Sequence, residues 1–167
     1  MIKTKLKIRL YGDPSLRKKS TPVKEVGSAE RLLIQSMLET MYEQKGIGLA
    51  APQVGINQRI FVMDIGQGPV IVVNPIIAKK LGSNVMEEGC LSIPGVTVQV
   101  KRPERIVVKY RDERGQLVEM AYQGLMARVI LHETDHLNGK LIVDYLNFKE
   151  RRALKDTLKQ IKEGKVG

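Results

Sequence analysis

The chain has 167 residues, of which 43% are apolar and 28% are charged. This composition is typical of one globular domain with a buried core, and we expect a single domain over residues 1–167. The single cysteine excludes an internal disulfide and favours a cytoplasmic protein, and no apolar run is long enough to cross a membrane. The net charge of +10 suits an anionic partner such as RNA, but equally a generally basic surface without a specific partner.

The first third of the sequence predicts a strand, a turn and an amphipathic helix. Apolar residues at positions 2, 6, 8 and 10 alternate with basic residues, which is the period of a strand rather than of a helical targeting segment. A turn at Gly12–Pro14 is followed by a short helix. Ser28 is suited to cap a helix over residues 29–44, and Gly46 ends it.

The middle of the sequence predicts strands and its end predicts helices. Stretches rich in valine and isoleucine indicate strands at 59–65, 70–78, 96–101, 105–111 and 117–122. Asp112–Gly115 is a hairpin turn. Residues 125–137 form a helix that is apolar nearly all round and hence buried, and a last helix covers about 147–162. This order predicts an α+β fold with mainly antiparallel sheets.

The buried helix carries the sequence His132-Glu133-Thr134-Asp135-His136, an H-E-x-x-H motif that contains the only two histidines of the chain. Residues four apart lie on one face of a helix, so both imidazoles can face one metal ion. The glutamate after the first histidine is placed to take a proton from a water molecule that the metal activates. The motif therefore predicts a divalent metal site with hydrolytic chemistry.

Spacing alone does not identify the third metal ligand. A catalytic metal site typically has three protein ligands and one open position, and the sequence has no third histidine. Two candidates remain, the thiol of Cys90 and a downstream carboxylate such as that of Glu150.

Two further segments point to a known family. Gly46–Gln53 is small and apolar and ends in one amide side chain, which suggests close approach of a ligand to the backbone. Together with Glu88–Ser92 and His132–His136, this segment resembles the G-x-G-x-A-A-x-Q, E-G-C-L-S and H-E-x-x-H stretches of peptide deformylases, in the same order. The resemblance also includes Gly12–Pro14 and Asp135–Gly139, so it spans nearly the whole chain.

The resemblance implies an enzyme that removes the N-formyl group from the formyl-methionine of new proteins and releases formate. The family's metal ligands and its proton-transfer residue map onto Cys90, His132, His136 and Glu133. Its oxyanion stabilisers map onto the side chain of Gln53 and the backbone N–H of Leu91. Members commonly use Fe²⁺ and accept nickel, cobalt or zinc, and their sheets pack around the central motif helix. We therefore expect Fe²⁺ as the cofactor and N-formyl-methionyl peptides as substrates.

The methionine side chain of such a substrate needs an apolar pocket. On the motif helix, two apolar residues precede His132 on its face, and two more come from other segments: Leu125, Val129, Ile47 and Met86. Gly48 and Gly89 would let the substrate backbone pair as an added strand. Behind the metal ligands, we expect a charge network that holds the Cys90 segment against the helix, formed by Glu88, Arg102 and Asp135.

The predicted last helix and its end are rich in basic residues, at 149, 151, 152, 155, 159, 162 and 165. In the family such a tail can dock at the ribosome, so the ribosome is a possible partner. Two other functions remain open. A metallopeptidase would use Glu150 as the third ligand and leave Cys90 free, whereas a non-catalytic RNA-binding or ribosome-binding module with a structural metal would not need Glu133.

Overall fold

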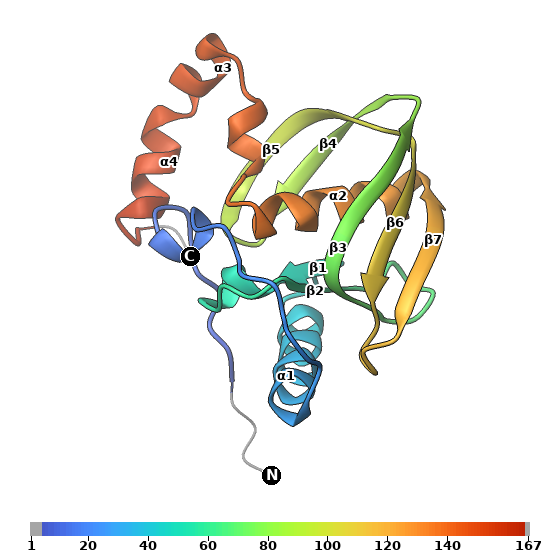
Figure 1. The fold of residues 1–167 in the computed structure, drawn as a ribbon. Helices are drawn as coiled ribbons and strands as arrows, with labels where there is room; N and C mark the ends of the chain where they lie inside the picture. The colour runs from blue at the N-terminus through green and yellow to red at the C-terminus, as the bar shows by residue number, and fades with distance from the viewer. Residues whose placement is uncertain (1–4, 166–167) are drawn as a thin grey trace.

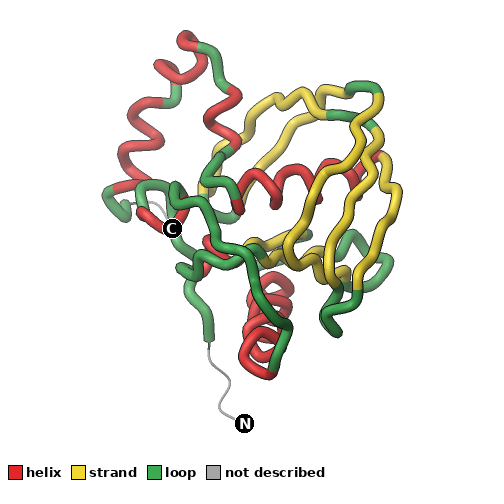
Figure 2. Tube along the Cα trace, viewed as in Figure 1, coloured by secondary structure: helices red, strands yellow, loops and turns green. Residues whose placement is uncertain are grey.

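The computed structural model describes residues 5–165, and it confirms the predicted α+β class with antiparallel sheets around one central helix. Helix α2 (Gly124–Leu137) carries the H-E-x-x-H motif. In Figure 1 this helix runs through the middle of the molecule, and the strands lie on several sides of it, as the yellow segments of Figure 2 also show. The motif is therefore held inside the fold rather than on its surface.

The strands form two antiparallel sheets. Five strands pair in the order β1-β2-β3-β6-β7: β1 (Gly48–Ala50), β2 (Ile60–Met63), β3 (Val70–Leu81), β6 (Arg105–Arg111) and β7 (Leu117–Gln123). The other two strands, β4 (Asn84–Cys90) and β5 (Ile93–Arg102), pair with each other. Valines at 96, 98 and 100 of β5 are buried while residues 97, 99 and 101 are exposed, so one face of this pair covers the core.

Helix α2 is buried because both its sides contact sheet. Its apolar residues, among them Ile130 and Leu137, pack in one core with residues of β2, β3 and β6, such as Phe61, Val72 and Val108. Helix α1 (Ser28–Glu43) packs on β1 and β2 through a second core that includes Ile34, Met37 and Met41. Three short 3-10 helices complete the framework: η1 (Pro14–Leu16), η2 (Ala51–Val54) and η3 (Ile142–Tyr145).

The predicted N-terminal strand is wrong for the residues that the structure describes. Residues 5–10 have no strand assignment, and Ile2 lies outside the described part of the chain. The segment does not pair along a single strand. Its backbone instead bonds to two separate parts of the chain, since Arg9 N–H donates to Gln53 O at 2.7 Å and Tyr11 N–H donates to Ser92 O at 2.8 Å. A segment with alternating apolar residues forms a strand only where a neighbouring strand is available to pair with it.

The helix ends differ from the prediction in two places. Ser28 is the first residue of α1 rather than its cap, since Gly27 occupies the N-cap and its N–H donates to the Glu30 carboxylate at 2.9 Å. The predicted last helix is divided at Leu154 into α3 (Phe148–Ala153) and α4 (Lys155–Lys162). Helix α3 has no buried residue, whereas α4 buries Leu158 and Ile161, so only α4 is packed on the body of the protein.

Within residues 5–165, none of the helices combines the length and the apolar character needed to span a bilayer.

Gly139, directly after α2, offers a test of this framework. It has φ +73°, and a Cβ there would lie 2.5 Å from the backbone oxygen of Arg17. Gly164 has the same φ, but nothing lies within 4 Å of its ideal Cβ. We predict that Gly139→Ala lowers the free energy of unfolding by about 3 kcal/mol and Gly164→Ala by about 1 kcal/mol, measured by urea denaturation. Equal losses would show that the packing against Arg17 contributes nothing beyond backbone strain.

Candidate active site

Helix α2 and the end of β4 bring three metal-binding side chains together. The ligand atoms of Cys90, His132 and His136 all lie within 4.8 Å of one another, and Cys90 Sγ is 3.4 Å from His136 Nε2. The β4–β5 register shifts between Gly89 and Cys90, a bulge that alters the direction of the strand just where the thiol is needed. Glu150, the alternative third ligand, is exposed on α3 and does not belong to this group.

The chemistry of these residues fits a divalent transition metal. One thiol and two imidazoles are ligands that suit iron, cobalt, nickel and zinc, and not magnesium or calcium. Within the described residues, Glu133 Oε2 and His136 Nδ1 are buried without a hydrogen-bond partner. Buried polar atoms are nearly always paired, so the unpaired carboxylate oxygen indicates that the site takes a group that the chain does not supply.

The surroundings of the two imidazoles shift their pKa values in opposite directions. Burial by itself would lower the pKa of His132, but hydrogen bonds to Cys90 and Glu88 raise it to about 10. Burial, assisted by the neighbouring His132, holds the pKa of His136 well below its usual value. The surroundings therefore favour one positive charge at the centre of the cluster, and a metal ion would supply it by displacing the proton of His132.

Glu133 occupies a dry position beside this cluster. Its side chain is 3% exposed, and burial raises the pKa of its carboxyl to about 7, although the nearby His132 and Arg102 act in the opposite direction. A Cβ at Gly48 would lie 2.5 Å from Glu133 Oε1, so only glycine at that position of β1 leaves room for the carboxyl. A group with a pKa near 7 can both accept and return a proton at neutral pH.

The three residues predicted to form a charge network are joined by hydrogen bonds. Arg102 Nε donates to Glu88 Oε2 at 2.6 Å, and its Nη1 donates to Asp135 Oδ2 at 2.9 Å. His132 Nδ1 lies 2.9 Å from Glu88 Oε1. Burial opposes ionisation of Glu88, but the bonds from His132 and Arg102 lower its pKa to about 2. Tyr145, which the sequence analysis did not single out, completes the network by donating to Asp135 at 2.6 Å.

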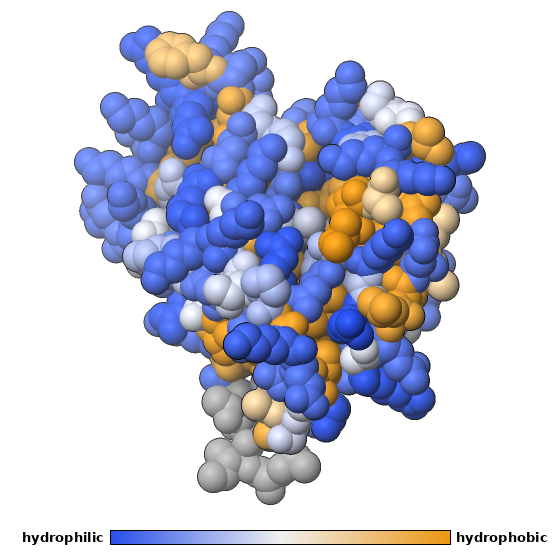
Figure 3. Space-filling view, viewed as in Figure 1, coloured by the Kyte–Doolittle hydropathy of each residue, from blue (hydrophilic) through white to orange (hydrophobic). Residues whose placement is uncertain are grey.

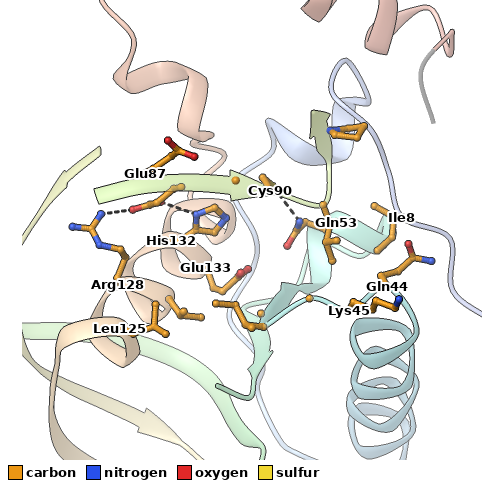
Figure 4. A pocket seen from close by; sticks show the side chains of 18 of the residues that line it. Ile8, Gln44, Lys45, Gln53, Glu87, Cys90, Leu125, Arg128, His132 and Glu133 are labelled. Carbon is orange, nitrogen blue, oxygen red and sulfur yellow. Dashed lines mark hydrogen bonds and ion pairs between the residues drawn. The ribbon is translucent and has the colours of Figure 1, made fainter. Parts of the chain in front are cut away.

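Arg128 is a second member of this network that the sequence analysis missed. It is 6% exposed, and its guanidinium donates to Glu88 Oε2 at 2.5 Å, to Val100 O at 2.9 Å and to Asn84 O at 2.8 Å. Figure 4 shows it beside His132 on α2. One signal was available, because Arg128 is the only charged residue between 125 and 131 and it precedes His132 by one helical turn.

A pocket of about 610 Å³ opens beside the metal-binding group, and this volume suits a small ligand. All the predicted binding residues line it: Ile47, Gly48, Met86, Gly89, Leu125 and Val129. Cys90, His132, Glu133, Gln53 and Leu91 also face it, whereas Arg102, Asp135 and His136 do not. Residues without a predicted role also line it: Ile8, Leu10, Gln44, Lys45 and Pro94. Of these, Ile8, Gln44 and Lys45 lie on the side away from His132 in Figure 4.

Gln53 lies where η2 meets the pocket. Its side chain is 1% exposed, and its Oε1 accepts the N–H of Ala50 at 2.9 Å. Its Nε2 is 3.5 Å from Cys90 Sγ, the contact drawn as a dashed line in Figure 4, and 3.1 Å from Ser92 Oγ. Three side chains able to hold a metal ion, a buried carboxyl and an amide donor around one apolar pocket are the arrangement expected of a hydrolase active site.

Comparison with known proteins identifies the family. The polypeptide deformylase family model matches residues 5–152. A curated peptide deformylase of Thermotoga neapolitana is 46% identical over 162 residues, which cover 96% of this chain and 99% of the relative. The chain therefore belongs to the polypeptide deformylase family and is an enzyme of that type, as the three motifs predicted.

Solved structures support the same conclusion. A peptide deformylase from Legionella pneumophila matches with a TM-score of 0.90 and 39% identity, over 97% of this chain and 98% of that chain. A peptide deformylase from Synechococcus elongatus, solved in complex with actinonin, matches with a TM-score of 0.87 and 43% identity, over 94% of this chain and 88% of that chain. The fold and the family assignment thus agree.

Arg128 is suited to a test of the network behind His132. We predict that Arg128→Gln speeds loss of bound Co²⁺ to a chelator by about 10- to 100-fold, because Glu88 then holds the His132 imidazole less firmly. Arg59→Gln is the matched control, since Arg59 donates to Leu137 O at 3.2 Å and so caps the same helix without contacting Glu88. Equal metal loss in both variants would assign the effect to general destabilisation of α2.

Proposed function

We propose that this enzyme hydrolyses the formamide bond of N-formyl-methionyl peptides and releases formate from nascent polypeptides. The observation that carries this proposal is the convergence of Glu133, Gln53 and the Cys90–His132–His136 group on one apolar pocket. The relative from Synechococcus elongatus was solved in complex with actinonin, which supports the binding of a small ligand by a protein of this fold. We also propose that residues 1–167 act as a single catalytic domain in the cytoplasm, where one free thiol stays reduced.

Cys90, His132 and His136 would hold one divalent metal, for which we propose Fe²⁺, with Ni²⁺, Co²⁺ or Zn²⁺ as substitutes. When bound, such an ion supplies Lewis acidity, which makes water acidic enough to act near pH 7 and polarises a carbonyl group. The network of Glu88, Arg102 and Asp135 keeps the His132 imidazole oriented through its Nδ1.

The substrate would bind through its side chain and its backbone. The methionine side chain enters the apolar part of the pocket, between Leu125 and Val129 of α2 and Ile47 before β1. Strand β4 pairs with β5 alone among the described strands, so its other edge at Gly89 is available for the extended substrate backbone. Gly48 leaves room for the Glu133 carboxyl, and because it has no side chain it would also let the substrate backbone approach β1.

Proton transfer and stabilisation of negative charge are carried out by different residues. Glu133 removes a proton from the attacking water and delivers it to the leaving amine. Negative charge develops on the formyl oxygen during this step, and the Nε2 group of Gln53 and the backbone N–H of Leu91 stabilise it by donating hydrogen bonds. The dry surroundings of Glu133 strengthen these interactions, since water does not compete for them.

The reaction is tested by formate release from an N-formyl-methionyl tripeptide, using anaerobically purified enzyme loaded with Fe²⁺ or Ni²⁺. We predict that Glu133→Ala abolishes release while the metal is retained. Gln53→Leu should lower kcat by about 10²- to 10³-fold, which is typical for the loss of one oxyanion donor. Gln44→Leu is the matched control, because Gln44 lines the same pocket on its far side and should leave kcat nearly unchanged.

Other outcomes would favour the alternatives. No formate release from folded, metal-loaded enzyme would favour a binding module over an enzyme active on formyl peptides. Metal retention by Cys90→Ser, with peptide hydrolysis preserved, would favour a metallopeptidase in which Cys90 is not a ligand.

We further propose that helices α3 and α4 dock on the ribosome, where formylated chains emerge. Between Phe148 and Lys165 the chain has seven basic and three acidic side chains. The lobe formed by these helices is mostly hydrophilic in Figure 3. Because Leu158 and Ile161 of α4 are buried, deleting the helix would disturb the core, so its exposed charges are the better target for mutation.

Reversing three exposed charges of this lobe should weaken ribosome binding in a salt-dependent way. We predict that the triple variant Arg151→Glu, Lys155→Glu, Lys159→Glu loses about tenfold or more in affinity in ribosome cosedimentation. The control reverses three exposed lysines of the sheet, Lys79, Lys80 and Lys109. Equal losses in the two triple variants would mean that total charge, and not this lobe, determines binding.

A further inference from the structure

Ser92 lies two residues after Cys90, in the turn between β4 and β5, and its side chain is completely buried. Its hydroxyl oxygen accepts a hydrogen bond from Gln53 Nε2 at 3.1 Å. Ser92 does not line the pocket, so it is not placed to contact a substrate. Its contact with the amide that does line the pocket suggests that it acts through Gln53.

The hydrogen bonds of Gln53 show what this contact achieves. Oε1 accepts the N–H of Ala50 at 2.9 Å, which determines which end of the amide faces the active site. Nε2 carries two N–H groups. One donates to Ser92 Oγ at 3.1 Å, and the other donates to Cys90 Sγ at 3.5 Å. Because Ser92 accepts one N–H, the other is directed at Cys90, on the side of the amide that faces the active site (Figure 4).

Both partners are themselves held by the N-terminal segment. Tyr11 N–H donates to the backbone oxygen of Ser92 at 2.8 Å, and Arg9 N–H donates to that of Gln53 at 2.7 Å. Residues 9–11 therefore join the turn after β4 to helix η2 and keep the hydroxyl and the amide at a fixed separation. This arrangement also gives a physical reason why the segment lies across the two elements.

We propose that Ser92 is a positioning residue, which accepts one N–H of Gln53 so that the other is directed at the formyl oxygen before the reaction begins. This role rests on the proposed function, because it assumes that Gln53 is an oxyanion donor. Donors that are oriented in advance need no rearrangement as charge develops, which is the main source of their effect on rate. Without the hydroxyl, the Gln53 amide is free to tilt away from that direction.

The kinetic test compares Ser92→Ala with Gln53→Leu and with the double variant, in metal-loaded enzyme. We expect Ser92→Ala to lower kcat by about tenfold with little change in KM, and to have no further effect once Gln53 is leucine. Ser15→Ala is the matched control: Ser15 is buried and donates to Pro52 O at 3.0 Å, next to Gln53, but does not contact its amide. It should leave kcat unchanged.

A second readout does not depend on metal or activity. In metal-free ¹⁵N-labelled protein, the side-chain amide signals of Gln53, assigned by their loss in Gln53→Leu, should shift and exchange faster with solvent in Ser92→Ala but not in Ser15→Ala. Unchanged Gln53 signals, or an equal fall in kcat in the wild-type and Gln53→Leu backgrounds, would overturn the proposal. Absence of formate release by wild-type enzyme would instead overturn the proposed function, while the amide signals still report whether Ser92 orients Gln53.

Discussion

The carboxylate of Glu88 is buried between two guanidinium groups and one imidazole, and much of the site depends on this arrangement. It links three elements, since Glu88 lies on β4, Arg102 on β5, and Arg128 and His132 on α2. A buried charge is stable only if all its partners are present, and removing one typically costs about 3–5 kcal/mol. The same contacts that join the β4–β5 pair to the motif helix therefore also fix the orientation of His132.

A second constraint is the space beside Glu133. The short strand β1 crosses α2 at the motif, and Gly48 leaves no side chain between them. Such close packing excludes water from the carboxyl and raises its pKa to about 7. The small residues of this segment thus affect the chemistry through burial, although none of them has a reactive group.

The sequence predicted those parts of the fold whose pattern is local. The apolar composition of α2, the valine-rich strands β3 and β6 and the turn at Asp112–Gly115 each depend on a short run of neighbouring residues. Strand β1 is too short to show a period, and β4 is largely exposed and bears charged residues, so neither has the composition of a buried strand. The prediction of a strand in the N-terminal segment was wrong for the opposite reason, because this segment has the sequence pattern of a strand but does not pair with one.

The residues of the candidate site could also be predicted only where a local sequence pattern indicates them. The motif spacing indicated His132 and His136, and the resemblance to a family indicated Cys90, Gln53 and Leu91. Neither Arg128 nor Ser92 was given a role, although Ser92 belongs to the E-G-C-L-S stretch, because what they do depends on long-range contacts with Glu88 and Gln53. Such contacts become visible only when the strands and the helix have been placed relative to one another.

The segment Glu88–Ser92 shows why a short motif can be so specific. Along a strand successive side chains point to opposite faces, so Glu88 is buried against α2 while Gly89 is exposed at the edge next to the pocket. The bulge at Cys90 then interrupts the alternation, and the turn after it places Leu91 at the pocket and Ser92 in the core beside Gln53. These residues contact several parts of the fold, with Glu88 bound to Arg102, Arg128 and His132, and Cys90 and Ser92 both bound to Gln53, so an insertion or deletion here would misplace several contacts at once. Because one backbone path determines all of these positions, the segment is constrained as a unit and not residue by residue.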